Sequence, residues 1–166
     1  MTAARARSGE LAAEAIGLLI DREQTIAAAE SLTGGLVAAA LTSIPGASAA
    51  FRGGVVAYAT DLKAAVLGVP DELLERCGAV DGAVAEAMAE GARTRMWTTV
   101  GVATTGVAGP DPAEGKPVGT VFVAVAGPTR TTSRELALMG SRDAIRMATV
   151  ESVLALLIAT MREEDR

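Results

Sequence analysis

The sequence of 166 residues lacks histidine and has a single cysteine, Cys77. The absence of histidine excludes Ser-His-Asp and Cys-His catalysis, HExxH zinc sites and facial-triad iron sites. One cysteine cannot form a disulfide framework within the chain or a multi-cysteine zinc site, and it fits a reducing cytoplasm. We therefore expect Cys77 to be a small, buried or half-buried apolar residue with no role in chemistry.

Aromatic residues and long apolar runs are scarce as well. The small aromatic share of 2% and a net charge of −5 argue against nucleic acid as a partner. Mean hydropathy is +0.35, but the longest apolar runs, such as VLALLIA at 153–159, fall far short of the roughly 18 residues that a membrane-spanning helix needs. Glu10 and Glu14 interrupt the N-terminal apolar stretch, unlike the core of a signal peptide. We expect a cytoplasmic protein that binds neither a membrane nor nucleic acid.

Small residues are what the chain has in quantity, with 35 alanines and 18 glycines. This composition predicts close-packed helices rather than an aromatic stacking surface. The length matches one domain of roughly 150 residues that buries a proper core. We expect a single domain, residues 1–166, with an ordered core from about residue 8 to about residue 160 and frayed ends.

Periodicity and turn residues predict an alternation of helices and strands. The predicted helices are 9–21, 33–44, 61–67, 71–77, 83–96 and 143–161, and the predicted strands are 24–29, 51–58, 99–104, 118–126 and 131–138. Ser8 and Asp81 are the expected N-caps of the first and fifth helices. The short GPT loop at 127–129 predicts a hairpin between the last two strands. The order predicts an α/β fold, with helices on both faces of a mixed sheet of about five strands.

The first candidate site segment is ESLTGG at 30–35, between a strand and a helix. Ligands of open α/β sheets bind beyond the carboxyl ends of strands. Ser31 would lie at a helix N-terminus, where the N–H groups of Thr33 and Gly34 can face an anion or a developing oxyanion. The alternative is structural: Ser31 or Thr33 caps the helix and the glycines allow close packing.

The second segment is YATDLK at 58–63. In a chain without histidine a serine nucleophile needs another base, and a lysine desolvated at the edge of a core can lose its proton near neutral pH. Lys63 can serve in this way, with Tyr58 relaying or orienting the proton. The alternative is a surface lysine on a short helix capped by Thr60, with Tyr58 at a strand end.

The third segment is TTGVAGPD at 104–111, followed by KPVGT at 116–120. Glycine-rich backbone after a strand can approach a phosphate or a ribose closely, although the spacing is neither a Walker loop nor GxGxxG. Arg142 and Arg146 lie four residues apart, on one face of the last helix, and can bind a phosphate. The alternatives are a loop that glycine merely permits and a solvated helix face.

Together these motifs resemble one family. From about residue 8 to about residue 160, their order and spacing are similar to those of the CinA C-terminal domain family. The stretches that carry this resemblance are AESLTGG, GGVVAY with the following lysine and LGV, ERCGAV, AEAMAEGAR, TTGVAGPD, KPVGTVFVA and GSRDAIR. The combination of ESxTGG, TGxAGP and KPVGTV is specific. Stand-alone members are nicotinamide-nucleotide amidases, whereas longer CinA proteins add an N-terminal molybdopterin-binding-like domain with a pyrophosphatase activity. Because the chain begins with Met and shows no such domain, we expect the stand-alone type.

The resemblance implies a three-layer α/β/α sandwich that hydrolyses the carboxamide of nicotinamide mononucleotide, giving nicotinate mononucleotide and ammonia in pyridine nucleotide recycling. It implies Ser31 as the nucleophile, Lys63 as its base and Tyr58 as an assisting residue. With the chemistry argued above, the expected substrate-binding residues are Thr33, Gly34, Thr105, Gly106, Gly109, Arg142 and Arg146. No cofactor is implied, and the few carboxylates near these motifs do not argue for a metal. We also expect a homo-oligomer, as is common in the family.

Four positions depart from the family pattern. Asp61 stands where asparagine is usual, and its charge is expected to raise the pKa of Lys63. Pro112 is expected to stiffen the substrate loop, while Ser141 and Asp81 replace residues that cap helices equally well. A second class of function stays open: a nucleotide-binding or regulatory interaction module of CinA type that has no turnover.

Overall fold

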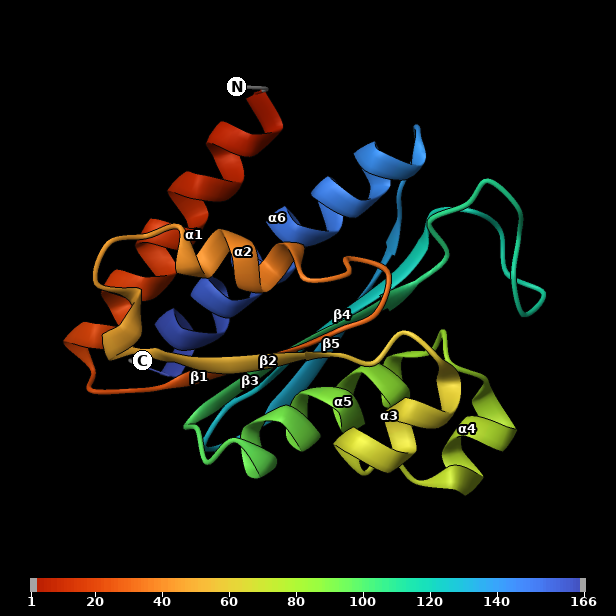
Figure 1. The fold of residues 1–166 in the computed structure, drawn as a ribbon, viewed down its shortest axis with the longest axis horizontal. Helices are drawn as coiled ribbons and strands as arrows, with labels where there is room; N and C mark the ends of the chain where they lie inside the picture. The colour runs from red at the N-terminus through yellow and green to blue at the C-terminus, as the bar shows by residue number, and fades with distance from the viewer. Residues whose placement is uncertain (1–2, 165–166) are drawn as a thin grey trace.

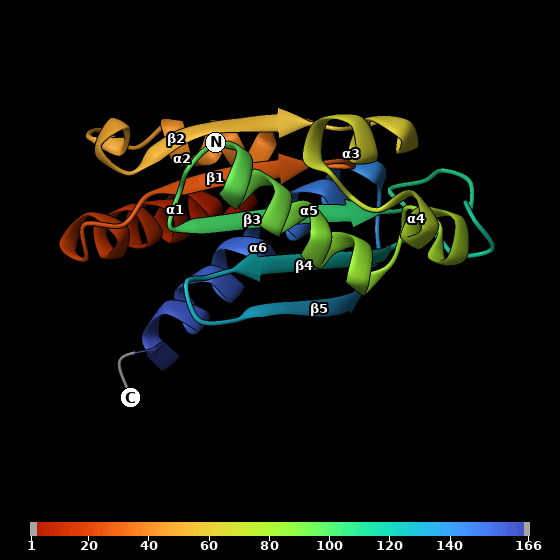
Figure 2. The same cartoon turned by 90° about the horizontal axis from the view of Figure 1, so that it is seen from below.

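A five-stranded mixed sheet forms the middle layer of the protein. The structure is a computed structural model that describes residues 3–164, with side chains from residue 6 on. The strands are β1 (Ile26–Glu30), β2 (Phe51–Val56), β3 (Val100–Gly106), β4 (Thr120–Ala126) and β5 (Thr131–Ala137), in the spatial order β2-β1-β3-β4-β5 (Figure 2). β1 runs parallel to β2 and β3, whereas β4 and β5 are antiparallel to their neighbours and form the predicted hairpin. The carboxyl ends of β1, β2 and β3 therefore lie at one end of the sheet.

Three helices cover each face of the sheet (Figure 1). α1 (Ala3–Asp21), α2 (Leu36–Thr42) and α6 (Arg142–Glu164) lie on one face, and α3 (Thr60–Leu67), α4 (Asp71–Cys77) and α5 (Gly82–Arg95) lie on the other. A short 3-10 helix, η1 (Ala47–Ala49), precedes β2. The predicted α/β fold, with helices on both faces of a five-stranded mixed sheet, is confirmed.

The two faces of the sheet bury different kinds of core. Large aliphatic side chains of α1 and α6, among them Leu19 and Leu157, pack against valines of β3 and β4. On the opposite face the strands contribute mainly alanines, which pack against α5. This contact is close: a Cβ built on Gly101 of β3 would lie 2.0 Å from the Ala89 carbonyl oxygen of α5. The abundance of alanine and glycine thus serves close helix-to-sheet packing, as the composition predicts.

By length and composition alone, α6 is apolar enough to cross a membrane. Its apolar side chains have partners within the fold, however. Val153, Leu154, Leu157 and Met161 are at most 1% exposed and pack in the core formed with α1 and the sheet. The hydropathy of α6 is that of a helix whose inner face lines a protein core.

Two helix starts differ from the sequence-based prediction. α1 begins at Ala3, and Ser8 is a buried residue within it, so the predicted cap at Ser8 is wrong. The alanine-rich turn before Ser8 continues the helix. α2 begins at Leu36 rather than Thr33, because residues 31–35 form turns in which Gly34 and Gly35 have φ of 57° and 100°. The predicted fraying of the chain ends concerns in part residues 1–2 and 165–166, which lie outside the described residues.

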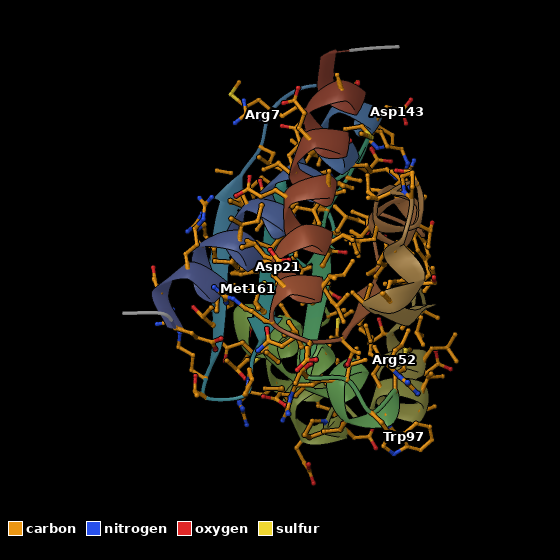
Figure 3. All side chains as sticks on the ribbon, turned by 90° about the vertical axis from the view of Figure 1, so that its left-hand side faces the viewer. Arg7, Asp21, Arg52, Trp97, Asp143 and Met161 are labelled. Atoms are coloured by element: carbon orange, nitrogen blue, oxygen red, sulfur yellow. The ribbon has the colours of Figure 1, made fainter. Side chains whose placement is uncertain are left out.

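The opposite end of the sheet carries the single tryptophan of the chain. Trp97, which precedes β3, is 81% exposed and points away from the molecule, near Arg52 of β2 (Figure 3). The Arg52 guanidinium donates to the Met96 carbonyl (2.9 Å). This end contains none of the predicted site residues.

Candidate active site

Ser31 and Lys63 meet at the carboxyl end of the parallel strands. Ser31 follows β1 directly, and its N–H donates to the Thr104 carbonyl of β3 (3.0 Å). Lys63 lies in the first turn of α3, the helix that follows β2. Because β1 and β2 are parallel neighbours, their ends bring the two side chains together, with Lys63 Nζ 3.1 Å from Ser31 Oγ.

The Lys63 amine is buried and held by backbone carbonyls. The residue is 1% exposed. Its Nζ donates to the Ala57 carbonyl at 2.8 Å and to the Tyr58 carbonyl at 3.5 Å. Burial lowers the pKa of Lys63 below its ordinary value, because the ammonium loses its hydration, and the negative charge of Glu114 opposes this by raising the pKa. Burial is the larger cause, so the site favours the neutral amine more than water does.

These contacts suit a base aimed at the serine. A neutral amine has two N–H groups and one lone pair, and the two carbonyls can accept both N–H groups. The lone pair of Lys63 Nζ then faces Ser31, whose hydroxyl can donate its proton to the amine. The arrangement can therefore activate the Ser31 hydroxyl without histidine.

A cavity of about 190 Å³ opens beside this pair. Residues from all three predicted segments line it, together with the junction between α4 and α5: Ser31, Leu32, Tyr58, Thr60, Lys63, Ala79, Val80, Thr105, Gly106, Ala108, Glu114 and Arg142. A larger groove of about 310 Å³ between α1, α2 and α6 contains no ionisable side chain. Of these two, the smaller cavity is the one lined by ionisable side chains. Among the described residues, no three His, Cys, Asp or Glu side chains gather as a metal site would.

Thr105 and Gly106 form one wall of the cavity, at the end of β3. The Thr105 hydroxyl donates to the Ala79 carbonyl at 2.6 Å, which ties β3 to the chain between α4 and α5. No Cβ fits on Gly106, because it would lie 2.7 Å from a methyl group of Val121. The close approach of β4 thus explains the glycine at this point of the wall.

Arg142 lies at the rim of the cavity, in the first turn of α6. Its guanidinium donates to the Gly109 carbonyl at 2.6 Å and to the Tyr58 hydroxyl at 2.9 Å. The structure therefore places the Tyr58 phenol against Arg142, while the Tyr58 carbonyl is the group that faces Lys63. Gly109 contributes an anchor for Arg142 and does not itself line the cavity.

Thr33, Gly34 and Arg146 are not among the residues that line the cavity. The Thr33 hydroxyl is 2.8 Å from that of Thr104, and the Gly34 N–H donates to the Ser31 carbonyl at 3.0 Å. The expectation that the Gly34 amide faces an oxyanion is therefore corrected. Arg146 donates to the carbonyls of Leu32 (2.9 Å) and Thr33 (3.2 Å), so it holds the turn that follows Ser31.

Comparison with known proteins identifies the family of this chain. The family model of the CinA C-terminal domain matches residues 8–161. The chain belongs to the CinA C-terminal domain family. A CinA-like protein of Frankia casuarinae is 55% identical over 142 residues, which are 86% of this chain and 33% of that protein. The chain thus spans about a third of the length of the curated relatives it matches.

Solved structures of CinA proteins match nearly the whole chain. A competence-damaged protein (CinA) superfamily protein from Klebsiella pneumoniae gives a TM-score of 0.91 at 30% identity, covering 94% of this chain and 98% of that chain. A competence/damage inducible protein from Agrobacterium tumefaciens gives 0.89 at 40% identity, covering 92% and 94%. The two solved chains are of similar extent to this chain.

The departures from the CinA pattern have local consequences. Asp61 is exposed and does not line the cavity, and the charge that raises the pKa of Lys63 is that of Glu114 instead. Ser141 and Asp81 cap their helices as expected, since their side chains accept the N–H groups of Ala144 (3.2 Å) and Ala83 (2.8 Å).

Sequence reasoning missed two carboxylates of this CinA domain. Glu30 is buried, and its oxygens accept the N–H groups of Gly35, Val37 and Ala38 at 2.9–3.0 Å. It fills the N-terminus of α2, so that helix end is not open to an anion. Its signal in the sequence is a glutamate at a strand end before a glycine turn and a helix. Glu114 has no comparable local signal, because its partners are Ala79 and Val80.

Proposed function

We propose that this CinA domain is a Ser-Lys amidohydrolase that converts nicotinamide mononucleotide to nicotinate mononucleotide and ammonia. The observation that carries the proposal is the buried Lys63 amine, 3.1 Å from the Ser31 hydroxyl in the wall of a cavity. An amide is a poor electrophile, so attack by an activated hydroxyl that forms a covalent intermediate is a suitable route.

In this scheme Ser31 Oγ attacks the carboxamide carbon while its proton passes to Lys63 Nζ. The tetrahedral intermediate collapses when the Lys63 ammonium returns the proton to the leaving nitrogen, which departs as ammonia. Water then attacks the acyl-Ser31 ester, with Lys63 again taking the proton. The bond between the acyl carbon and Ser31 Oγ breaks as Lys63 returns that proton to the serine, and nicotinate mononucleotide leaves as the carboxylate, its acid proton passing to solvent. Because the Gly34 amide is already bonded, the N–H groups of Leu32 and Thr33 are the candidates in this turn for binding the oxyanion.

The choice of a mononucleotide rests on the family resemblance and on the shape of the site. A cavity of about 190 Å³ is smaller than the sites of whole drug-sized ligands, which span roughly 300–1,000 Å³. We infer that it receives the pyridine carboxamide, while the ribose phosphate extends past the rim. Arg142 lies there, and a guanidinium is well suited to a phosphate.

Ammonia release from nicotinamide mononucleotide by the purified protein tests the proposal. Nicotinamide and nicotinamide riboside, which lack the phosphate, are the substrate controls. Ser31→Ala should abolish release, whereas Ser48→Ala, at an exposed position in η1, should not. Nucleotide binding without release from any nicotinamide nucleotide would favour the regulatory binding module instead.

A further inference from the structure

Glu114 occupies an unfavourable backbone conformation in the long loop between β3 and β4, which projects from the end of the sheet that carries the site (Figure 2). Ala113 and Lys116 exchange two backbone hydrogen bonds, at 3.2 and 2.9 Å, and so close a two-residue turn. Its central residues, Glu114 and Gly115, have φ of 53° and 70°. Such turns favour asparagine or glycine at both positions. A glutamate at the first one points to a role for its side chain.

The Glu114 carboxylate joins this loop to the chain between α4 and α5. Its two oxygens accept the N–H groups of Ala79 and Val80, each at 3.0 Å. The fit is tight, because a Cβ on Gly78 would lie 2.5 Å from one of those oxygens. Ala79 and Val80 line the cavity, and the Ala79 carbonyl also accepts the Thr105 hydroxyl. Glu114 thus fixes the part of the cavity wall that Ala79 and Val80 form.

Glu114 is also the only carboxylate among the residues that line the cavity. The other ionisable side chains in that lining are Lys63 itself, Tyr58 and Arg142, and the last two are bonded to each other at the rim. Around the same helix, Asp61 is exposed on α3 and the Arg95 guanidinium of α5 lies beside Gly68. The carboxylate of Glu30, at the end of β1, is bonded to the N-terminus of α2. The negative charge within the cavity is therefore that of Glu114.

We propose that Glu114 is a positioning residue for the Ser31–Lys63 pair: it fixes the cavity wall at Ala79 and Val80, and its charge stabilises the ammonium that Lys63 forms on taking the Ser31 proton. The inference rests on the proposed Ser-Lys chemistry. In the step concerned, the Ser31 O–H bond breaks, the new O–C bond forms at the carbonyl carbon, and the proton stays on Lys63 Nζ. Glu114 takes no part in these bonds. Its raising effect on the pKa of Lys63 has the sign that this role requires.

A direct titration of Lys63 tests the electrostatic part. The chain has two lysines, Lys63 and Lys116, so Lys116→Arg leaves a single lysine signal for ¹³Cε NMR. In that background Glu114→Gln should move the titration midpoint of Lys63 to lower pH. Glu75→Gln is the matched control, because it removes the same charge from an exposed position of α4, and it should leave the midpoint in place. An unmoved midpoint in Glu114→Gln would overturn the electrostatic role.

Acylation of Ser31 by p-nitrophenyl acetate tests the same role in turnover, without the nucleotide. In Glu114→Gln the acid limb of the rate profile should move to lower pH. The plateau rate should fall by roughly tenfold, less than the 10²–10³ of a donor that touches the reacting atoms. Glu114→Asp, which keeps the charge, should keep the parental acid limb. Glu114→Asp and the control Glu75→Gln are both expected to give the parental rate profile. If Glu114→Gln gives the parental profile as well, the proposal is wrong.

The two proposals can fail separately. A displaced acid limb in a protein that releases no ammonia from nicotinamide mononucleotide would overturn the substrate and support the role of Glu114. If the protein is an active amidase and Glu114→Gln raises only KM, with the acid limb of the rate profile unmoved, Glu114 has only a structural role and its electrostatic role is overturned.

Discussion

Replacing Lys63 by methionine should change how the stability of the protein depends on pH. In the folded protein burial lowers the pKa of Lys63, whereas in the unfolded chain the amine titrates near about 10.4. Between these two values the unfolded chain holds one proton more than the folded protein. The free energy of unfolding of the parent therefore rises with pH across this window. Methionine has no titratable group, so the variant lacks this contribution.

The size of the effect follows from one proton. A difference of one bound proton gives a slope of about 1.4 kcal/mol per pH unit. A second contribution is independent of pH: the Ala57 carbonyl loses the Nζ that donates to it at 2.8 Å, at a cost of about 1–3 kcal/mol. At neutral pH the variant gains because its folding does not require an amine to lose its proton, and this gain offsets that loss. As the pH rises the gain disappears, so the variant becomes steadily less stable relative to the parent.

Urea unfolding of both proteins from about pH 7 to about pH 10 measures this difference, since the window ends near the pKa of an unfolded lysine. Leu67→Met is the control, because it alters a buried position of α3 and removes no ionisable group. Its difference from the parent should not depend on pH. A flat difference for Lys63→Met as well would mean that folding does not lower the pKa of Lys63, and the neutral base of the proposed mechanism would be lost.

Three further predictions concern the neighbours of this amine. Ser31→Ala should lower kcat by about 10³-fold or more while nucleotide binding is kept. The double variant with Lys63→Ala should lose little more activity, because the two residues act as one unit. Near-parental turnover in Ser31→Ala would instead indicate direct attack by water. Arg142→Ala should raise KM for the mononucleotide by roughly 10- to 150-fold, as expected for a lost charged hydrogen bond to phosphate. Arg146→Ala should instead lower kcat, since Arg146 holds the turn after Ser31. Steady-state kinetics that reverse these two effects would place the phosphate at Arg146. Glu30→Gln should lower the free energy of unfolding by about 1–3 kcal/mol, because its carboxylate accepts three N–H groups; unchanged urea and thermal unfolding would contradict this.

The sequence predicts the sheet and the meeting of its strand ends well, for a physical reason. Alternating strands and helices, followed by a hairpin, are compatible with few topologies. Once β1, β2 and β3 are parallel neighbours, the residues that follow them must lie at one end of the sheet. Ser31, Lys63 and Thr105 therefore come together with no knowledge of their contacts. Local patterns were sufficient because Ser31 and Lys63 follow their strands within a few positions and Thr105 lies near the end of β3.

The errors arise where a specific side-chain contact, rather than periodicity or charge, decides a local structure. Periodicity places the start of α2 at Thr33, but the buried Glu30 carboxylate binds the N–H groups of the helix start and leaves residues 31–35 as turns. Arg146 contacts the same turn from α6, more than a hundred residues away. Charge alone suggested that Arg146 binds phosphate. Only the fold reveals that its guanidinium is directed at backbone carbonyls.

The basicity of Lys63 depends on two kinds of group that respond differently to mutation. Burial and the carbonyls of Ala57 and Tyr58 belong to the backbone and the fold, so no single side chain can be exchanged to remove them. Glu114 is a side chain on a central residue of an exposed turn, and it acts on the pKa of Lys63 in the opposite direction. The fold thus lowers the pKa, and one replaceable residue raises it in part. It follows that residue 114 is the position through which the pH range of Ser31 activation can be changed while the sheet and its cores stay intact.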